Sequence, residues 1–143
     1  MTTMKAILVA ADGSNQADRA LKHALELIAS GLASELHILN VQPNLSSRVA
    51  SFISREQIEA YHREEGEKAL SSAVAIAKQA SVPAKTHIGV GRQGEIVADF
   101  AKKLGAGLVV LGTRGHTGLA GVLLGSVAQD VIAHSSVPVT LVK

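Results

Sequence analysis

The 143-residue sequence contains no cysteine and very few aromatic residues. Without cysteine, the chain has no disulfide framework, no thiolate nucleophile and no thiolate metal ligand. Aromatic residues make up only 2% of the chain, which excludes a platform on which the bases of single-stranded nucleic acid would stack. Hydrophobic residues nevertheless make up 47% of the chain, so the core must be aliphatic.

Strong charge of one sign and long apolar runs are also missing. The formal net charge is +2, and the basic residues are spread along the chain, so no polybasic surface for nucleic acid is predicted. No segment approaches the roughly 18 consecutive apolar residues of a membrane span, and the first apolar run is too short for a signal peptide. These absences predict a cytoplasmic protein that binds neither nucleic acid nor a membrane.

The length of the chain fits a single domain, residues 1–143. Short apolar runs that end at turns predict five strands: Ala6 to Ala11, Leu36 to Val41, Pro83 to Val90, Gly107 to Leu111 and Val137 to Val142. Apolar residues three and four apart predict helices. These helices are one from Ser14 or Asn15 to near Gly31, one from Ile58 to Ala80, one with apolar residues Ile96 to Leu104, and a short one near Val122 to His134. The polar segment Pro43 to Ser54 is predicted to be a mobile loop.

Strands and helices alternate along the whole chain. This alternation predicts an α/β fold with an open parallel sheet, helices on both faces and right-handed crossover connections. In such sheets, ligands bind outside the carboxyl ends of the strands, at the point where the strand order reverses. The residues that follow the strands are therefore the candidate site residues.

A glycine-rich segment, GTRGHTGLAGVLLGS, follows the fourth predicted strand and leads into the last helix. Such a segment aims backbone N–H groups at one point, and the helix N-terminus adds partial positive charge, which together favour an anion such as phosphate. The segment matches neither a P-loop nor the dinucleotide pattern G-x-G-x-x-G. Its candidate phosphate contacts are Gly112, Thr113, Arg114, Gly115, Gly125 and Ser126.

Asp12 lies at the end of the first predicted strand, within the sequence Ala11-Asp12-Gly13-Ser14. A carboxylate at this place is able to hold a ribose diol, as acidic residues do at strand ends in nucleotide-binding sheets. The sequence D-G-S also favours a turn, so an Asx turn or a helix cap is the alternative role. If the first and fourth strands are neighbours, a nucleotide would place its ribose on Asp12, its phosphates on the glycine-rich segment and its base near Val41.

The glycine spacing resembles that of a known family. Gly112-x-x-Gly115, followed after nine residues by Gly125-Ser126, matches the G-2x-G-9x-G-[S/T] ATP-binding pattern of the universal stress protein family. The D-G-S turn, the G-V-G sequence at Gly89 to Gly91 and the final S-V-P-V-T-L-V run also resemble that family. The resemblance implies a Rossmann-like fold of the adenine nucleotide alpha hydrolase-like type, with strand order 3-2-1-4-5. It further implies a homodimer through the last strands, Val137 to Val142.

The resemblance also implies an adenine nucleotide as ligand, and we expect this ligand to be ATP, bound with Mg²⁺. Carried over by position, Asp12 would contact the ribose and the backbone of Val41 would contact adenine. The phosphates would lie against Gly112, Gly115, Gly125 and Ser126, with a further amide from Val127. Two positions depart from the family pattern: Ala11, where a bulkier aliphatic residue is common, and Gly94, where a proline often begins the helix.

These observations predict an ATP-binding universal stress protein that acts as a stress-response regulatory module. We expect at most slow ATP hydrolysis, because phosphoryl transfer needs a positioned nucleophile and no carboxylate or serine lies near His116 in the sequence to orient it. The other histidines lack paired ligand spacing, so no dedicated metal site is predicted. Two alternatives are a nucleotide-free homodimeric interaction module and a flavodoxin-like FMN carrier, for which few aromatic residues are available to cover the flavin.

Overall fold

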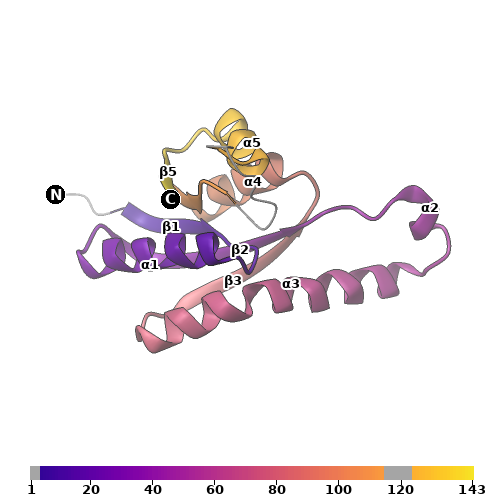
Figure 1. Cartoon of the computed structure of the whole chain (residues 1–143), viewed down its shortest axis with the longest axis horizontal. Coiled ribbons are helices and arrows are strands. Elements are labelled where there is room, and N and C mark those ends of the chain that lie inside the picture. The colour runs from indigo at the N-terminus through magenta and orange to yellow at the C-terminus, as the bar shows by residue number, and fades with distance from the viewer. Residues whose placement is uncertain (1–3, 115–123) are drawn as a thin grey trace.

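Five parallel strands form the sheet in the computed structural model, which describes residues 4–114 and 124–143 (Figure 1). The strand order is β3-β2-β1-β4-β5, which confirms the order that the family resemblance implied. The order reverses between β1 and β4. The strands are β1 (Met4–Ala10), β2 (Ala33–Gln42), β3 (Ala84–Val90), β4 (Ala106–Gly112) and β5 (Val139–Val142).

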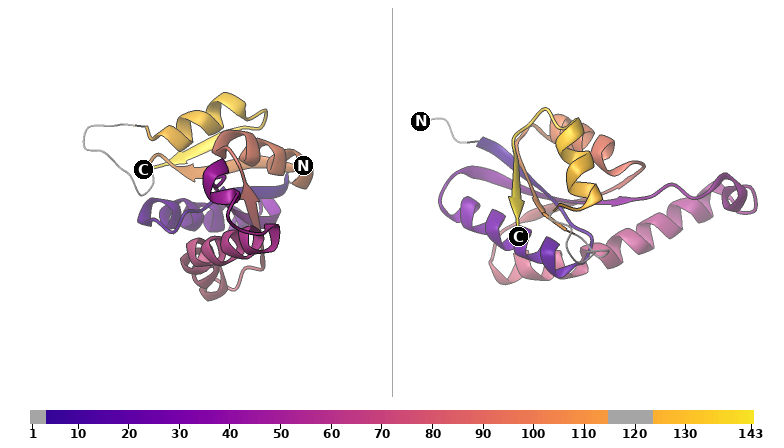
Figure 2. Two further views of the ribbon diagram at one scale, coloured as in Figure 1. Left: turned by 90° about the vertical axis from the view of Figure 1, so that its right-hand side faces the viewer. Right: turned by 45° about the horizontal axis from the view of Figure 1, so that its top comes forward.

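Helices cover both faces of the sheet, as the alternation predicted. The helices are α1 (Asn15–Ala29), α2 (Ser47–Ala50), α3 (Arg55–Gln79), α4 (Gln93–Leu104) and α5 (Ser126–His134). Helices α1 and α3 lie on one face and α4 and α5 on the other (Figures 1 and 2). Helix α2 and the first turns of α3 extend beyond the carboxyl end of β2 (Figure 1). No helix in these two described ranges has the length and hydropathy to cross a membrane.

The apolar run of β1 fills the core on both faces of the sheet. Successive residues of a strand point to opposite faces, and Ile7 and Val9 pack on the side of α1 and α3. Leu8 packs on the side of α4 and α5, with Leu39 and Val109 from the neighbouring strands. A continuous apolar run rather than an alternating one is therefore what a central parallel strand requires.

Serine side chains begin three of the helices. The Ser14 hydroxyl accepts a hydrogen bond from the backbone N–H of Ala17 at 3.1 Å, and Ser46 and Ser54 cap α2 and α3 in the same way. Each such cap contributes about 1 kcal/mol to helix stability. The cap that the sequence assigned to Ser14 or Asn15 is thus Ser14. Helix α5 differs from these three, with consequences for the site.

Some predicted boundaries were wrong. The last strand begins at Val139 rather than Val137, because Pro138 has no N–H to donate to a ladder. The segment Pro43 to Ser54 contains the short helix α2 and is not wholly irregular. Helix α5 begins at Ser126, because Gly125 before it has an extended backbone with ψ at 162°. Val122, near which that helix was predicted to begin, lies outside the described residues.

Candidate functional site

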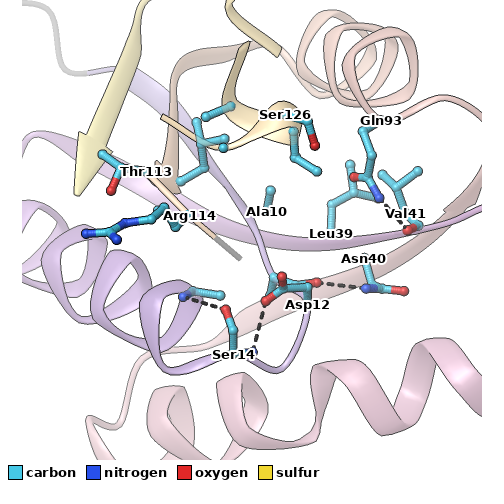
Figure 3. Close-up of a pocket in the computed structure, with 17 residues that line it drawn as sticks. Ala10, Asp12, Ser14, Leu39, Asn40, Val41, Gln93, Thr113, Arg114 and Ser126 are labelled. Atoms are coloured by element: carbon cyan, nitrogen blue, oxygen red, sulfur yellow. Dashed lines mark hydrogen bonds between the residues drawn. The ribbon is translucent and has the colours of Figure 1, made fainter. Parts of the chain in front are cut away.

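A pocket opens at the carboxyl ends of β1, β2 and β4, where the strand order reverses (Figure 3). This is the place at which open α/β sheets bind their ligands. Its volume is about 210 Å³, which is many times the space that one water molecule needs. The pocket therefore admits an organic ligand rather than a single ion.

Every predicted site residue that the structure describes lines this pocket. These residues are Asp12, Val41, Gly112, Thr113, Arg114, Gly125, Ser126 and Val127. Gly115 and His116 lie outside the described residues. Residues from three separate parts of the chain, chosen because they follow strands, thus meet in one place.

Asp12 occupies the turn between β1 and α1. The backbone N–H of Ala11 still pairs with the Leu39 carbonyl at 2.9 Å, and the chain then leaves the sheet. The Asp12 Oδ1 atom accepts a hydrogen bond from the backbone N–H of Ser14 at 2.9 Å, so the turn that the sequence offered as an alternative role is present. The same side chain lines the pocket. Since a carboxylate has about four lone-pair sites, the turn and a ligand contact do not exclude each other.

The two ends of the glycine-rich segment are held together at the end of β4. The backbone N–H of Thr113 donates to the Val142 carbonyl of β5 at 2.9 Å, and the N–H of Gly125 donates to the Thr113 carbonyl at 2.6 Å. Gly112 has a packing reason to be glycine, because a Cβ there would lie 3.0 Å from the Cβ of Gln16. Gly125 has φ at −69° and ψ at 162°, a conformation open to any residue, so its backbone does not require glycine.

Helix α5 begins at the pocket with no side chain as its cap. Its N-cap residue is Gly125, which makes no side-chain hydrogen bond to the first turn, in contrast to the serine caps of α1, α2 and α3. The first residues of the helix, Ser126 and Val127, line the pocket. The N-terminal N–H groups and the helix dipole therefore give this wall of the pocket partial positive charge.

The lining of the pocket also contains two polar side chains that the sequence analysis missed, Asn40 and Gln93. The Asn40 amide donates to the Ala11 carbonyl at 2.8 Å, and the Gln93 amide donates from Nε2 to the Val41 carbonyl at 3.0 Å (Figure 3). Gln93 begins α4 just after β3 ends. The rule that selected Asp12, namely that site residues follow strands, would have selected Gln93 as well.

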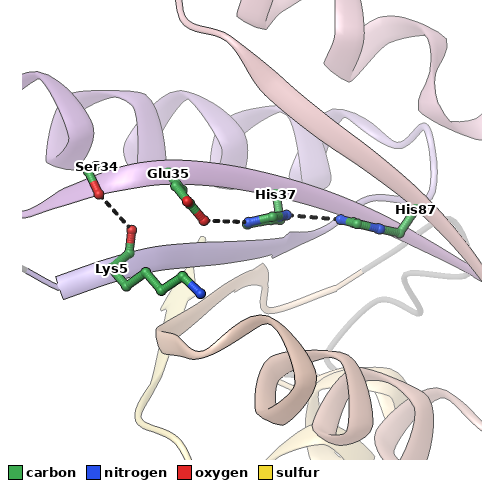
Figure 4. Close-up of polar contacts among 5 residues, drawn as sticks. All are labelled: Lys5, Ser34, Glu35, His37 and His87. Atoms are coloured by element: carbon green, nitrogen blue, oxygen red, sulfur yellow. Dashed lines mark hydrogen bonds and ion pairs between the residues drawn. The ribbon is translucent and has the colours of Figure 1, made fainter.

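A second polar cluster lies on the α4 side of β2 and β3, outside the pocket (Figure 4). His37 is 2% exposed, and its Nδ1 atom is 2.9 Å from Nε2 of His87. Its Nε2 atom is 3.2 Å from a carboxylate oxygen of Glu35. The imidazole rings stack with centroids 5.1 Å apart, and Phe100 contacts the His87 ring. The sequence analysis missed this pair because the two residues are 50 positions apart.

The contacts of this cluster shift two pKa values. The hydrogen bond from His37 lowers the pKa of Glu35. Burial lowers the pKa of His87, and the charges of His37 and Lys85 lower it further. The cluster is a chain of hydrogen bonds rather than a metal centre: within the described part of the chain, no three acidic or imidazole side chains are grouped to hold a metal ion.

The comparisons with known proteins agree on one family. The profile described as the universal stress protein family matches residues 3–143. "Universal stress protein MJ0531" from Methanocaldococcus jannaschii is 35% identical over 142 residues, which cover 97% of this chain and 82% of that relative.

Two solved structures share the fold over nearly the whole chain. The hypothetical protein MJ0577 superposes with a TM-score of 0.80 at 30% identity, covering 99% of this chain and 97% of that one. A universal stress protein in complex with cAMP superposes with a TM-score of 0.74 at 26% identity, covering 99% of each chain. At least one protein of similar structure therefore binds an adenine nucleotide.

Proposed function

The chain belongs to the universal stress protein family, and we propose that it is a stress-response regulatory module that binds ATP with Mg²⁺ in this pocket. One observation carries the proposal: the N-terminus of α5, which has no side-chain cap, opens onto the same pocket as Asp12. An anion binds favourably at such a helix end, and a carboxylate at a neighbouring strand end suits a ribose. The cAMP complex of a similar protein supports an adenine nucleotide as the class of ligand.

In the proposed complex, the ribose lies on Asp12 and the base lies against the backbone of Val41. The phosphates lie on the first turn of α5, from Gly125 to Val127, and on Gly112, with Gly115 as a further proposed contact. Arg114 is exposed and lies on the side of the pocket away from Gln93 (Figure 3). Its charge is therefore available to phosphates rather than to the base.

The residues present fit a magnesium ion that enters with the nucleotide. Mg²⁺ usually keeps several waters and is bound largely through substrate phosphates, so the ion would be held by the nucleotide, while Asp12, the only carboxylate among the described residues that line the pocket, serves the ribose. When bound, the ion neutralises phosphate charge. The same described lining contains no histidine or lysine, and we propose that hydrolysis is slow at most, because the pocket offers no general base other than Asp12.

A calorimetric titration with MgATP tests this function on the nucleotide-stripped protein and a Gly125→Leu variant. A leucine side chain at the N-cap would cover the amides of the first turn, and loss of two charge-assisted hydrogen bonds weakens binding about hundredfold or more. The matched control is Ala133→Leu, which places the same side chain at an exposed position of α5. The control should bind MgATP as the parent does.

The other outcomes separate the alternatives. Equal binding of MgATP by the parent and by Gly125→Leu would show that the phosphates do not bind at the glycine-rich segment. No binding by the parent would favour a nucleotide-free interaction module. A yellow purified protein would favour FMN, although the described lining of the pocket contains no aromatic side chain to cover a flavin.

The proposal extends to a cytoplasmic homodimer formed through the last strand. Strand β5 is the edge strand of the sheet, and β4 is its only neighbour among the described strands. Its second side is therefore available to template another chain. Sedimentation equilibrium should give twice the mass of the chain, and the mass of one chain would exclude the dimer.

A further inference from the structure

Among the residues that the structure describes, the carboxamide of Gln93 is only partly used in hydrogen bonding. Its Nε2 atom donates to the Val41 carbonyl at 3.0 Å, and the side chain lines the pocket. In Figure 3 the carboxamide lies beside Val41, with its oxygen on the cavity side. Gln93 therefore lines the part of the pocket in which we propose that the nucleotide base binds.

The neighbouring carbonyl fixes which way the carboxamide faces. A carbonyl oxygen only accepts hydrogen bonds, so the amide nitrogen and not the amide oxygen must face Val41. The reversed orientation would set two acceptors against each other. With the nitrogen beside Val41, the Oε1 atom lies on the cavity side (Figure 3), so Gln93 presents an acceptor there.

The residues on both sides of Gln93 are anchored to Asp130 of α5. Arg92 forms an ion pair with Asp130 Oδ1 at 3.0 Å, and the backbone N–H of Gly94 donates to Oδ2 at 2.6 Å. A Cβ on Gly94 would overlap the Asp130 carbonyl oxygen, so the two helices meet here at a distance that only glycine permits. These contacts fix the backbone on both sides of Gln93, so its side chain is pre-organised before any ligand binds.

We infer that Gln93 is a specificity-determining residue that selects a base with an amino group at the six-position of the purine. This inference rests on the proposed function. The amino group of adenine has two N–H donors, one for the Val41 carbonyl and one for Gln93 Oε1. Hypoxanthine has a carbonyl oxygen at that position, which would face these two acceptors, and its one proton on that edge is on N1. The site thus prefers ATP to ITP, which differs from ATP only on this edge of the base.

Calorimetry with MgATP and MgITP on the parent and on Gln93→Met tests the inference. Methionine keeps the length of the side chain but neither donates nor accepts strongly. The parent should bind ATP more tightly than ITP, and in the variant the ratio of the two affinities should fall about tenfold, the effect of one hydrogen bond in a partly buried site. Weaker binding of ATP and relief of the repulsion toward the ITP carbonyl should both contribute to the fall. The matched control is Gln79→Met, at an exposed position at the far end of α3, which should keep the parental ratio.

Each of the other possible results of this experiment contradicts one part of the inference. A parent that binds ATP and ITP equally, or a variant with an unchanged ratio, overturns the role of Gln93 and leaves nucleotide binding intact. Equal weakening of both ligands in the variant assigns Gln93 a packing role only. A parent that binds neither nucleotide overturns the proposed function and this inference together. If Gln93→Met does not fold, Gln93→Asn, which withdraws the oxygen by one methylene, decides between the same outcomes.

Discussion

Polar groups lie at both ends of β2, and the two ends use their hydrogen bonds differently. At the carboxyl end, Val41 lines the pocket, and its carbonyl accepts a hydrogen bond from the Gln93 carboxamide (Figure 3). Toward the amino end, Glu35 bonds to His37, and His37 bonds to His87 on the next strand (Figure 4). Val41 and His37 are both buried, so burial alone does not tell the two ends apart.

The difference lies in how much hydrogen-bonding capacity the fold has already used. Both ring nitrogens of His37 already have hydrogen-bond partners on β2 and β3, namely Glu35 and His87. The hydrogen-bonding capacity of His37 is therefore used within the cluster. The Gln93 carboxamide uses its nitrogen on Val41 and presents its oxygen to the cavity. A buried polar group that is satisfied inside the fold stabilises it, whereas capacity directed into a cavity marks a binding site. The two ends of β2 should therefore respond to different measurements.

The largest effect should come from removing the centre of the histidine cluster. His37→Leu removes a ring that is 2% exposed and bonded at both nitrogens, which should lower the free energy of unfolding by about 2 kcal/mol. Urea denaturation measures this loss. The affinity for MgATP should not change, because His37 does not line the pocket.

A matched variant makes this result specific. His23 lies on α1 with a side chain that is 39% exposed, and His23→Leu should change stability by less than about 0.5 kcal/mol. A large loss of nucleotide affinity in folded His37→Leu would break the comparison, because it would show that the two ends of β2 are coupled.

A smaller effect, with the opposite pattern, should follow from Asp12→Asn at the pocket end. The asparagine oxygen still accepts the hydrogen bond from the Ser14 N–H, so the turn and the stability of the fold should be kept. The carboxylate that we place on the ribose is lost, which should weaken MgATP binding about tenfold. Calorimetry measures the affinity, and thermal denaturation checks the fold.

A ligand lacking the ribose hydroxyls sharpens this test. The parent should bind 2′,3′-dideoxy-ATP more weakly than ATP, and Asp12→Asn should bind the two alike, since the hydroxyls have lost their partner. Asp99→Asn, at an exposed position of α4, is the control. Full ATP affinity in Asp12→Asn would mean that Asp12 serves the turn alone.

Much of the fold followed from local patterns, because apolar runs and helical spacing depend on neighbours in sequence. Five strands, their parallel arrangement and the two helical layers were predicted in this way, but the strand order came from the family resemblance. The rule that ligands lie at strand ends brought Asp12, Val41 and Ser126 to one pocket. Their roles toward a nucleotide stay predictions.

The missed features depend on contacts between distant residues. The pairing of His37 with His87 follows from the register of β2 and β3, in which Leu39 lies opposite His87, and no local pattern specifies that register. The orientation of Gln93 depends in the same way on Asp130, which lies in a different helix. Sequence spacing reveals where a strand ends, but it does not reveal which side chain across the sheet is left with an unused acceptor.

The smallest expected effect is the pH dependence of the histidine cluster. Burial, with the charges of His37 and Lys85, lowers the pKa of His87, so the folded protein favours its neutral form. The stability that depends on this group is fully present above the ordinary histidine pKa of about 6.5 and is lost as the pH falls through the lowered value in the fold. His87→Gln should remove this loss, because the amide is able to donate to His37 Nδ1 and does not titrate.

This pH dependence is tested by measuring the midpoint of thermal unfolding at about pH 8 and at about pH 5. These two conditions bracket the titration of histidine. The midpoint of the parent should fall further between these conditions than that of His87→Gln, whereas His23→Gln should follow the parent. Lys5, Glu35 and Lys85 lie near the cluster and are unchanged in the variant, so they contribute equally to both curves. Equal falls in parent and His87→Gln would mean that the cluster does not sense protons. If the falls differ while the affinity for MgATP keeps the same pH profile in both proteins, the polar groups at the amino end of β2 serve the fold and those at its carboxyl end serve the ligand.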